Sequence, residues 1–271
     1  MAEEMSASME EYIAQVERNV NRAYVIAAAA RAKGFDPEEE VNVPLAKNMA
    51  ERVEGIVSTV CPGLLNSGVA QRLHELEKTF GELDWRVALK IAEEVAEGKF
   101  FHFESKIKAI ETGIRVGIAY LTLGIVASPL EGFVELKVKQ RFDGKEYFSL
   151  MYSGPIRSAG GTAAAVSVIV ADYLRVINGF SPYDPTEEEV QRVITEMRDY
   201  HERVANLQYF PTEEEASFLL RRLPVQINGD PSEEMEVSNF KDLPRIETNR
   251  IRSGVCLVLA EGVAQKAKKV H

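Results

Sequence analysis

Several residue types that would point to a specific chemistry are scarce in this chain of 271 residues. It has only two cysteines, Cys61 and Cys256, which lie far apart and form no C-x-x-C pair. We therefore expect reduced, buried thiols in an intracellular protein and no disulfide framework. The four histidines show no metal-ligand spacing with each other or with the cysteines, which argues against a zinc site. We expect no bound metal here.

Long apolar runs are also missing. The longest near-apolar stretch, residues 162–170, is far shorter than the roughly 20 residues that a membrane span needs. The acidic N-terminus does not resemble a secretory signal. We therefore expect a cytoplasmic protein without membrane contact. Because 45% of the residues are hydrophobic, the chain can still bury a sizeable core, and its length allows two domains.

An excess of basic residues, which a simple nucleic-acid-binding protein would carry, is missing as well. The net charge is −10, which argues against such a protein. The charge is uneven, with +2 for residues 101–183 against −7 for 1–100 and −5 for 184–271. Ordinary scatter explains this difference as well as a local anion-binding surface does.

Apolar spacing predicts one amphipathic helix over residues 8–33, which ends at Gly34 and precedes an acidic linker, 36–44. A single helix cannot cover its own apolar stripe, so we expect it to dock on the rest of the chain or on another chain. The stripe residues that we expect at an assembly interface are Tyr12, Ile13, Val16, Val20 and Tyr24.

The rest of the chain predicts a predominantly helical α+β fold. At least four helices follow the linker, one of them starting near Ser67 as its N-cap, and they favour a helix bundle. Alternation then predicts a strand over 133–140, in which Val134, Leu136 and Val138 share one face, a turn at Asp143-Gly144 and a returning strand over 146–152. A helix from about Gly161 and another with a capping box at Thr186 complete a small unit. The expected regions are 1–44, N-terminal helix and linker; 45–130, helical domain; 131–205, α+β unit; and 206–271, an irregular segment with a final helix from Val255 to about Ala267.

A glycine-rich stretch, GPIRSAGGT (154–162), joins the hairpin to its helix. The stretch departs from the P-loop motif G-x-x-x-x-G-K-[ST] at two positions, because Pro155 stands where the first glycine belongs and Gly161 where the lysine belongs. It also lacks the G-x-G-x-x-G spacing of dinucleotide-binding turns and the G-x-S-x-G motif of a nucleophile elbow. The stretch therefore does not predict nucleotide hydrolysis, dinucleotide binding or acyl transfer.

General physical features of this stretch nevertheless suit a phosphate. A helix N-terminus presents unpaired N–H groups and a partial positive charge, and glycines let an anion approach the backbone closely. The residues that we predict to contact a nucleic-acid backbone are Arg157, Ser158, Gly160, Gly161 and Thr162 in the stretch and Lys137, Lys139, Arg141 and Lys145 in the hairpin. The alternative is that the glycines only pack the helix against the hairpin, while Arg157 pairs with a nearby carboxylate.

Three longer segments carry a family resemblance. They are YSGPIRSAGGTAAAVSVIVADYLR (152–175), the segment 223–269, which begins LPVQINGDPSEEMEVSNF, and RAKGFDPEEEVNVPLAKNMAERVEGIV (31–57). In order and spacing they resemble the start of the large subunit of the archaeal family D DNA polymerase (DNA polymerase II). The resemblance covers nearly the whole chain.

The resemblance implies the N-terminal region of a replicative DNA-directed DNA polymerase, whose catalytic aspartates lie outside these residues. It implies no cofactor in this fragment and magnesium for the full-length enzyme. The implied partners are DNA, a small proofreading subunit with exonuclease activity and other copies of the large subunit, in the archaeal cytoplasm near the nucleoid. Part of this region is likened in the family to a KH domain, but residues 154–161 contain no strict G-x-x-G loop, so the unit is only loosely KH-like.

Three functions therefore stand beside one another. The first is a DNA-contacting and assembly module that is non-catalytic by itself. The second is a purely structural oligomerisation scaffold without DNA contact, which the net charge favours. The third, a stand-alone enzyme, is supported by no motif. Residues 244–254 contain three arginines, Arg245, Arg250 and Arg252, to which the sequence assigns no role.

Overall fold

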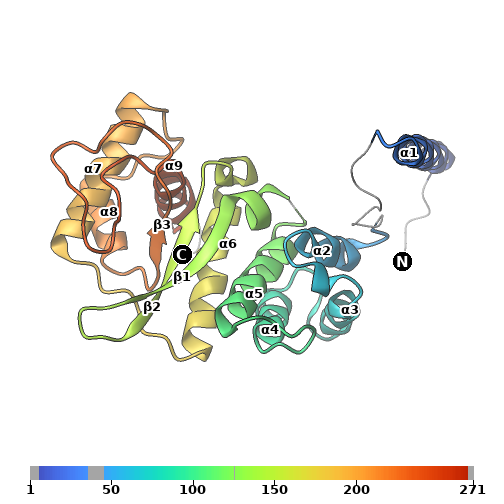
Figure 1. The fold of residues 1–271 in the computed structure, drawn as a ribbon, viewed down its shortest axis with the longest axis horizontal. Coiled ribbons are helices and arrows are strands. Elements are labelled where there is room, and N and C mark those ends of the chain that lie inside the picture. Colours follow the sequence, from blue (N-terminus) through green and yellow to red (C-terminus); the bar gives the residue numbers. More distant parts are fainter. Residues whose placement is uncertain (1–5, 36–45, 125, 268–271) are drawn as a thin grey trace. The chain divides into compact units, whose positions relative to one another are not determined.

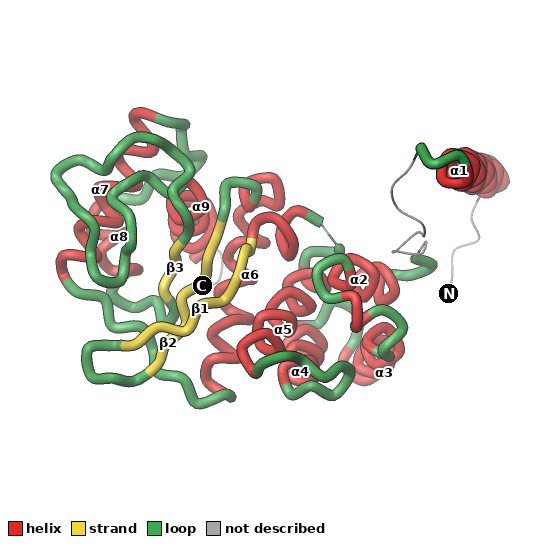
Figure 2. Tube along the Cα trace, viewed as in Figure 1, coloured by secondary structure: helices red, strands yellow, loops and turns green. Residues whose placement is uncertain are grey.

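The computed structural model describes residues 6–35, 46–124 and 126–267, and Figures 1 and 2 draw their helices and strands. The chain divides into two compact units, Met1–Pro44 and Leu45–His271. In the first, α1 (Ala7–Ala32) forms the predicted N-terminal helix, and none of its residues is buried. The predicted linker, 36–44, lies outside the described residues. Of the stripe expected at an assembly interface, Val20 is half-buried and four side chains are exposed: Tyr12, Ile13, Val16 and Tyr24.

The second unit begins with the predicted helix bundle. Its helices are α2 (Met49–Ser58), α3 (Val69–Phe80), α4 (Trp85–Ala96) and α5 (Lys106–Leu121), with a short 3₁₀ turn, η1 (Pro62–Leu64), after α2. The N-cap of α3 is Gly68 rather than Ser67, because the chain enters that helix with a φ of +101°, which glycine adopts without strain. Cys256 is buried as expected, but Cys61, at the end of α2, is only half-buried.

The predicted hairpin forms one edge of a three-stranded sheet, β1-β2-β3, in the described residues. Its strands are β1 (Phe133–Gln140) and β2 (Glu146–Tyr152), and β3 (Gln226–Asn228) pairs in parallel with β2. The sequence does not predict β3, because a fully buried strand of three residues shows no alternation. The prediction that Val134 shares the buried face is also wrong: a bulge between Phe133 and Glu135 turns Val134 outward, and it is 39% exposed.

Helix α6 (Ile156–Ile177) is the central element of this unit. It packs against α4 and α5 and against two π-helical turns, η2 (Ala127–Gly132) and η3 (Val258–Ala264). Gly160 interrupts it with φ +81° and ψ 161°, so that its continuous part begins at Gly161, as predicted. Among the described helices, only α6 is long and apolar enough to cross a membrane, and half of that stretch is buried inside the protein.

The remaining elements pack beside the sheet (Figure 1). Helix α7 (Glu187–Arg203) begins at the predicted capping box of Thr186 and Glu189, and α8 (Glu213–Leu220) begins at a second one. The predicted C-terminal helix is interrupted: α9 (Ser253–Leu257), η3 and α10 (Gln265–Ala267) follow one another. One apolar core runs through the predicted regions 45–130, 131–205 and 206–271, with Ile110, Leu136, Val170 and Val255 as members.

Candidate nucleic-acid contact surface

The two adjacent glycines of the stretch 154–162 lie in different surroundings. Gly160 has a left-handed φ of +81°, and a Cβ atom added there would meet nothing within 4 Å. Gly161 is helical, and an added Cβ would lie 2.0 Å from the backbone oxygen of Glu261. Gly160 therefore turns the chain, while Gly161 allows α6 and η3 to approach each other closely.

Arg157 has a carboxylate partner inside the protein. Its Nη2 donates to Oε1 of Glu261, 3.1 Å away, and to the backbone oxygen of Asn206, 2.9 Å away. The same Glu261 oxygen accepts from the backbone N–H of Gln208 at 2.9 Å. The Arg157 side chain is 35% exposed, so solvent still reaches it. The arginine–carboxylate pair of the packing alternative is thus present, but the close glycine contact packs α6 against η3 and not against the hairpin.

The hydroxyl groups of the stretch lie nearer to solvent. Ser158, Gly160 and Thr162 are exposed, whereas Gly161 is half-buried. The Oγ of Ser158 donates to the backbone oxygen of Pro155 at 2.7 Å, a bond within its own turn. Of the predicted phosphate-contacting residues of the stretch, Ser158, Gly160 and Thr162 are therefore exposed, while Arg157 and Gly161 are half-buried.

The four basic residues of the hairpin each have an acidic neighbour as well. The ion pairs are Lys137–Glu135 (3.1 Å), Lys139–Glu247 (2.5 Å), Arg141–Asp143 (3.2 Å), Arg141–Asp184 (3.5 Å) and Lys145–Asp143 (3.6 Å). The Lys145 side chain is 67% exposed, but that of Lys139 is only 14% exposed. Burial lowers the pKa of Lys139 in spite of its pairing with Glu247. In contrast, the hydrogen bond to Glu135 raises the pKa of Lys137.

Arg245 connects the hairpin to α7, a role that sequence reasoning missed. Its guanidinium donates to both carboxylate oxygens of Glu189, at 2.8 and 2.6 Å, and to Asp184 at 2.6 Å. It also lies 4.4 Å from the ring centroid of Phe142, near the tip of the hairpin. Lys139 donates to the backbone oxygen of Arg245 at 3.1 Å. Arg245 thus anchors the hairpin. Sequence reasoning missed this because local patterns do not predict a partner such as Glu189, 56 residues away.

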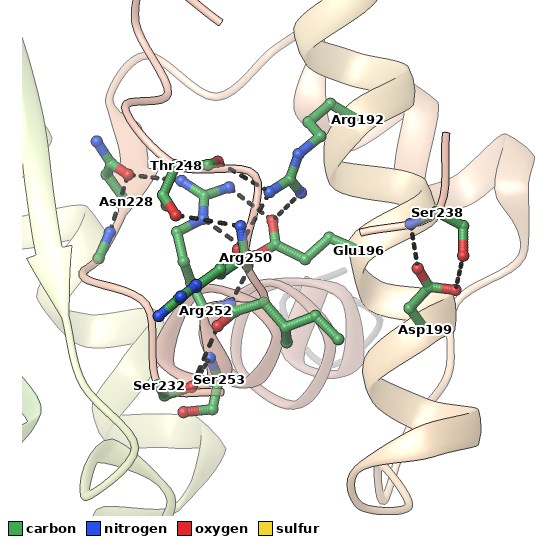
Figure 3. A network of polar contacts seen from close by, with 12 residues as sticks. Arg192, Glu196, Asp199, Asn228, Ser232, Ser238, Thr248, Arg250, Arg252 and Ser253 are labelled. Atoms are coloured by element: carbon green, nitrogen blue, oxygen red, sulfur yellow. Dashed lines mark hydrogen bonds and ion pairs between the residues drawn. The ribbon is translucent and has the colours of Figure 1, made fainter. Parts of the chain in front are cut away.

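A second buried arginine, Arg252, belongs to the polar network of Figure 3. It donates to both oxygens of Glu196, at 3.0 and 2.6 Å, and to the side-chain oxygen of Asn228 at 2.6 Å. Arg192 donates to the same carboxylate at 2.8 Å and to the backbone oxygens of Thr248 and Arg250. The charged groups of Glu196 and its two arginines are buried. The network therefore fastens the irregular segment before α9 to α7, and of the three arginines in 244–254 only Arg250 is exposed.

No candidate metal site emerges in the part of the chain that the structure describes. Within 6–35, 46–124 and 126–267, no three His, Cys, Asp or Glu side chains come together in a way that could hold a metal ion. Around the glycine stretch, the groups available to an anion are hydrogen-bond donors and the Arg157 cation, and the carboxylate of Glu261 lies beside that cation.

Comparisons with known proteins give one consistent result. Residues 11–271 match the family described as the DNA polymerase II large subunit DP2, N-terminal. The chain is 51% identical over 254 residues to a DNA polymerase II large subunit of Nanoarchaeum equitans, covering 94% of the chain and 20% of that relative. It is 44% identical over 269 residues to the DNA polymerase II large subunit of Pyrococcus horikoshii, covering 98% of the chain and 18% of that relative. It is 44% identical over 273 residues to the large subunit of Thermococcus kodakarensis, covering 100% of the chain and 15% of that relative. The chain thus spans about a fifth, or less, of these relatives.

Proposed function

This chain belongs to the family defined by the N-terminal region of the DNA polymerase II large subunit, and on that premise we propose that it serves DNA binding and subunit assembly in a replicative polymerase. The observation that carries the proposal is identity of 44–51% over nearly the whole chain to proteins named as that subunit. In this proposal the full-length subunit is a magnesium-dependent DNA-directed DNA polymerase. The catalytic aspartates lie outside these residues, so the fragment alone is non-catalytic.

The assembly role is assigned to α1. Its exposed apolar side chains, among them Tyr12 and Val16, give it a surface that a partner chain would cover. The partners proposed for this region are other copies of the large subunit and the small proofreading subunit. Deleting residues 1–44 should lower the oligomeric mass in size-exclusion chromatography with light scattering. An unchanged mass would contradict the assignment to α1.

The DNA-contacting role is assigned to the hairpin and the glycine turn. The donors proposed to meet DNA phosphates are Lys137, Lys139, Arg141 and Lys145 with Arg157, Ser158, Gly160, Gly161 and Thr162. Contacts of this kind position a duplex without reading its sequence. The supporting observation is the exposed turn at Ser158, Gly160 and Thr162, preceded by a basic hairpin in the only third of the chain with a positive net charge.

The test is DNA binding by this chain across a salt series. The logarithm of the affinity for a labelled primer–template should fall linearly with the logarithm of the salt concentration, with a slope of about −0.9 for each phosphate contacted. Arg157→Ala and the double variant Lys137→Ala/Lys139→Ala should weaken binding and flatten this slope. If both variants bound like the parent, the assigned residues would be the wrong ones.

The second candidate function is a structural scaffold without DNA contact. Two observations favour it: the net charge of −10 and the carboxylate partner beside every proposed cation. In this case deletion of residues 1–44 changes the oligomeric mass, and neither parent nor variants bind DNA at low salt. The salt series and the mass measurement together separate the two functions.

A further inference from the structure

Each of the proposed DNA-contacting cations is paired with a carboxylate of the same chain. Five cations, Lys137, Lys139, Arg141, Lys145 and Arg157, are paired with five carboxylates, Glu135, Asp143, Asp184, Glu247 and Glu261. DNA binding gains its strength when free cations neutralise phosphates and release the counterions condensed on DNA. A cation that is already paired contributes to this only if the phosphate replaces its carboxylate.

We propose that these carboxylates compete with DNA phosphates for the cations of the hairpin and the glycine turn, and that they thereby limit the affinity of this region for DNA. The inference rests on the proposed DNA-contacting function and concerns the regulation of that same site. It also divides the cations into two groups, because their side chains differ in exposure.

Lys139 and Arg141 are held in place and do not exchange. Lys139 is 14% exposed and also donates to the backbone oxygen of Arg245. Arg141 is 20% exposed, and it donates to the backbone oxygen of Pro182 at 2.9 Å. Moving either side chain to a phosphate would break these bonds as well as the ion pair, so both residues anchor the hairpin.

Lys137, Lys145 and Arg157 are the cations that exchange. Lys137 and Glu135 are both solvent-exposed, and ion pairs of this type contribute little. Lys145 is the most exposed of the five cations. Their partners Glu135 and Asp143 are exposed and can turn toward water when a phosphate arrives, so exchange at these two pairs requires no rearrangement of the core.

Arg157 is the most informative member of this group. Arg157 also donates to the backbone oxygen of Asn206, and this bond breaks when it leaves, but its side chain is more exposed than those of Lys139 and Arg141. Its buried partner Glu261 then keeps the hydrogen bond from the Gln208 N–H, so that carboxylate does not lose every donor. The turn that carries Arg157 is separated from the continuous part of α6 by the non-helical Gly160. The pair therefore lies at a break in the helix, where a small movement of the turn would redirect the guanidinium outward.

The test compares charge-removing variants of the same size. Glu261→Gln and Glu135→Gln each remove one carboxylate that pairs with a proposed cation, and Glu214→Gln removes an exposed carboxylate from α8 as the matched control. Affinity of this chain for a fluorescein-labelled primer–template is measured by anisotropy between 50 and 200 mM salt. Each freed cation should steepen the slope by about 0.9, which is a three- to four-fold larger loss of affinity over this salt range. The control should leave the slope unchanged.

A double variant shows whether the effect passes through the assigned pair. Glu261→Gln/Arg157→Ala should bind like Arg157→Ala alone, since the glutamate then has no cation to compete for. If Glu261→Gln fails to fold, Glu135→Gln still tests the competition, because the Glu135 side chain is exposed. If the parent binds DNA but both amide variants behave like Glu214→Gln, the competition is refuted while the DNA-contacting function stands. If neither parent nor variants bind DNA at 50 mM salt, both are refuted.

Discussion

Replacing Gly161 by alanine asks whether the glycine stretch serves packing or phosphate contact. The added Cβ would lie 2.0 Å from the Glu261 oxygen, and an ordinary contact begins at 3.4 Å, so α6 and η3 must separate by up to 1.4 Å. Overpacking of this kind costs about 1–3 kcal/mol of unfolding free energy. In a chain of this size each kcal/mol corresponds to roughly 2–4 °C in Tm. We expect Tm to fall by about 2–12 °C in a calorimetric or fluorescence-monitored melt.

Whether the substitution lowers or raises Tm distinguishes the two explanations. Gly161 has helical dihedral angles, so in open space alanine would stabilise the helix, by about 0.5–1 kcal/mol. Thr162→Ala, one position further along the helix and exposed, is the matched control and should leave Tm nearly unchanged. If Gly161→Ala were as stable as the parent but bound DNA more weakly, the packing explanation would fail and close approach of a phosphate would replace it.

Three further predictions concern stability. Glu196→Ala leaves two buried arginines without their carboxylate and should lower the unfolding free energy by about 3–5 kcal/mol in urea; a loss below about 1 kcal/mol would contradict the role of the network. Thr186→Ala removes the capping box of α7 and should lower the unfolding free energy by about 0.5–2 kcal/mol, whereas Thr186→Ser should keep most of it. Hydrogen bonds from Arg72 lower the pKa of Glu94 from its ordinary value, so this pair stabilises the fold above pH of about 4.3 and its contribution is lost as pH falls through the lowered pKa. The stability difference between the parent and Arg72→Gln should therefore be constant near neutral pH and shrink in acid; a difference that grew below pH 4 would refute the pairing.

Local patterns were sufficient for most helices and for the hairpin. The capping box at Thr186 and the Asp143-Gly144 turn are short-range signals, and the structure confirms both. The bulge beside Phe133 and the π-helical turn η3 escaped prediction, because each inserts or shifts a residue in response to packing against other elements. Strand β3 escaped for a related reason: three buried residues carry no periodic pattern.

For this protein, the sequence by itself determined the family, the predominantly helical α+β class and the location of the glycine stretch between a hairpin and a long helix. Only the tertiary structure decided what that stretch contacts. Glu261 and Arg157 are 104 residues apart in the sequence, and the Lys139–Glu247 pair is separated by 108. Hydrophobic periodicity and capping motifs describe neighbours within a few residues, whereas the pairing of charges depends on which distant elements the core brings together.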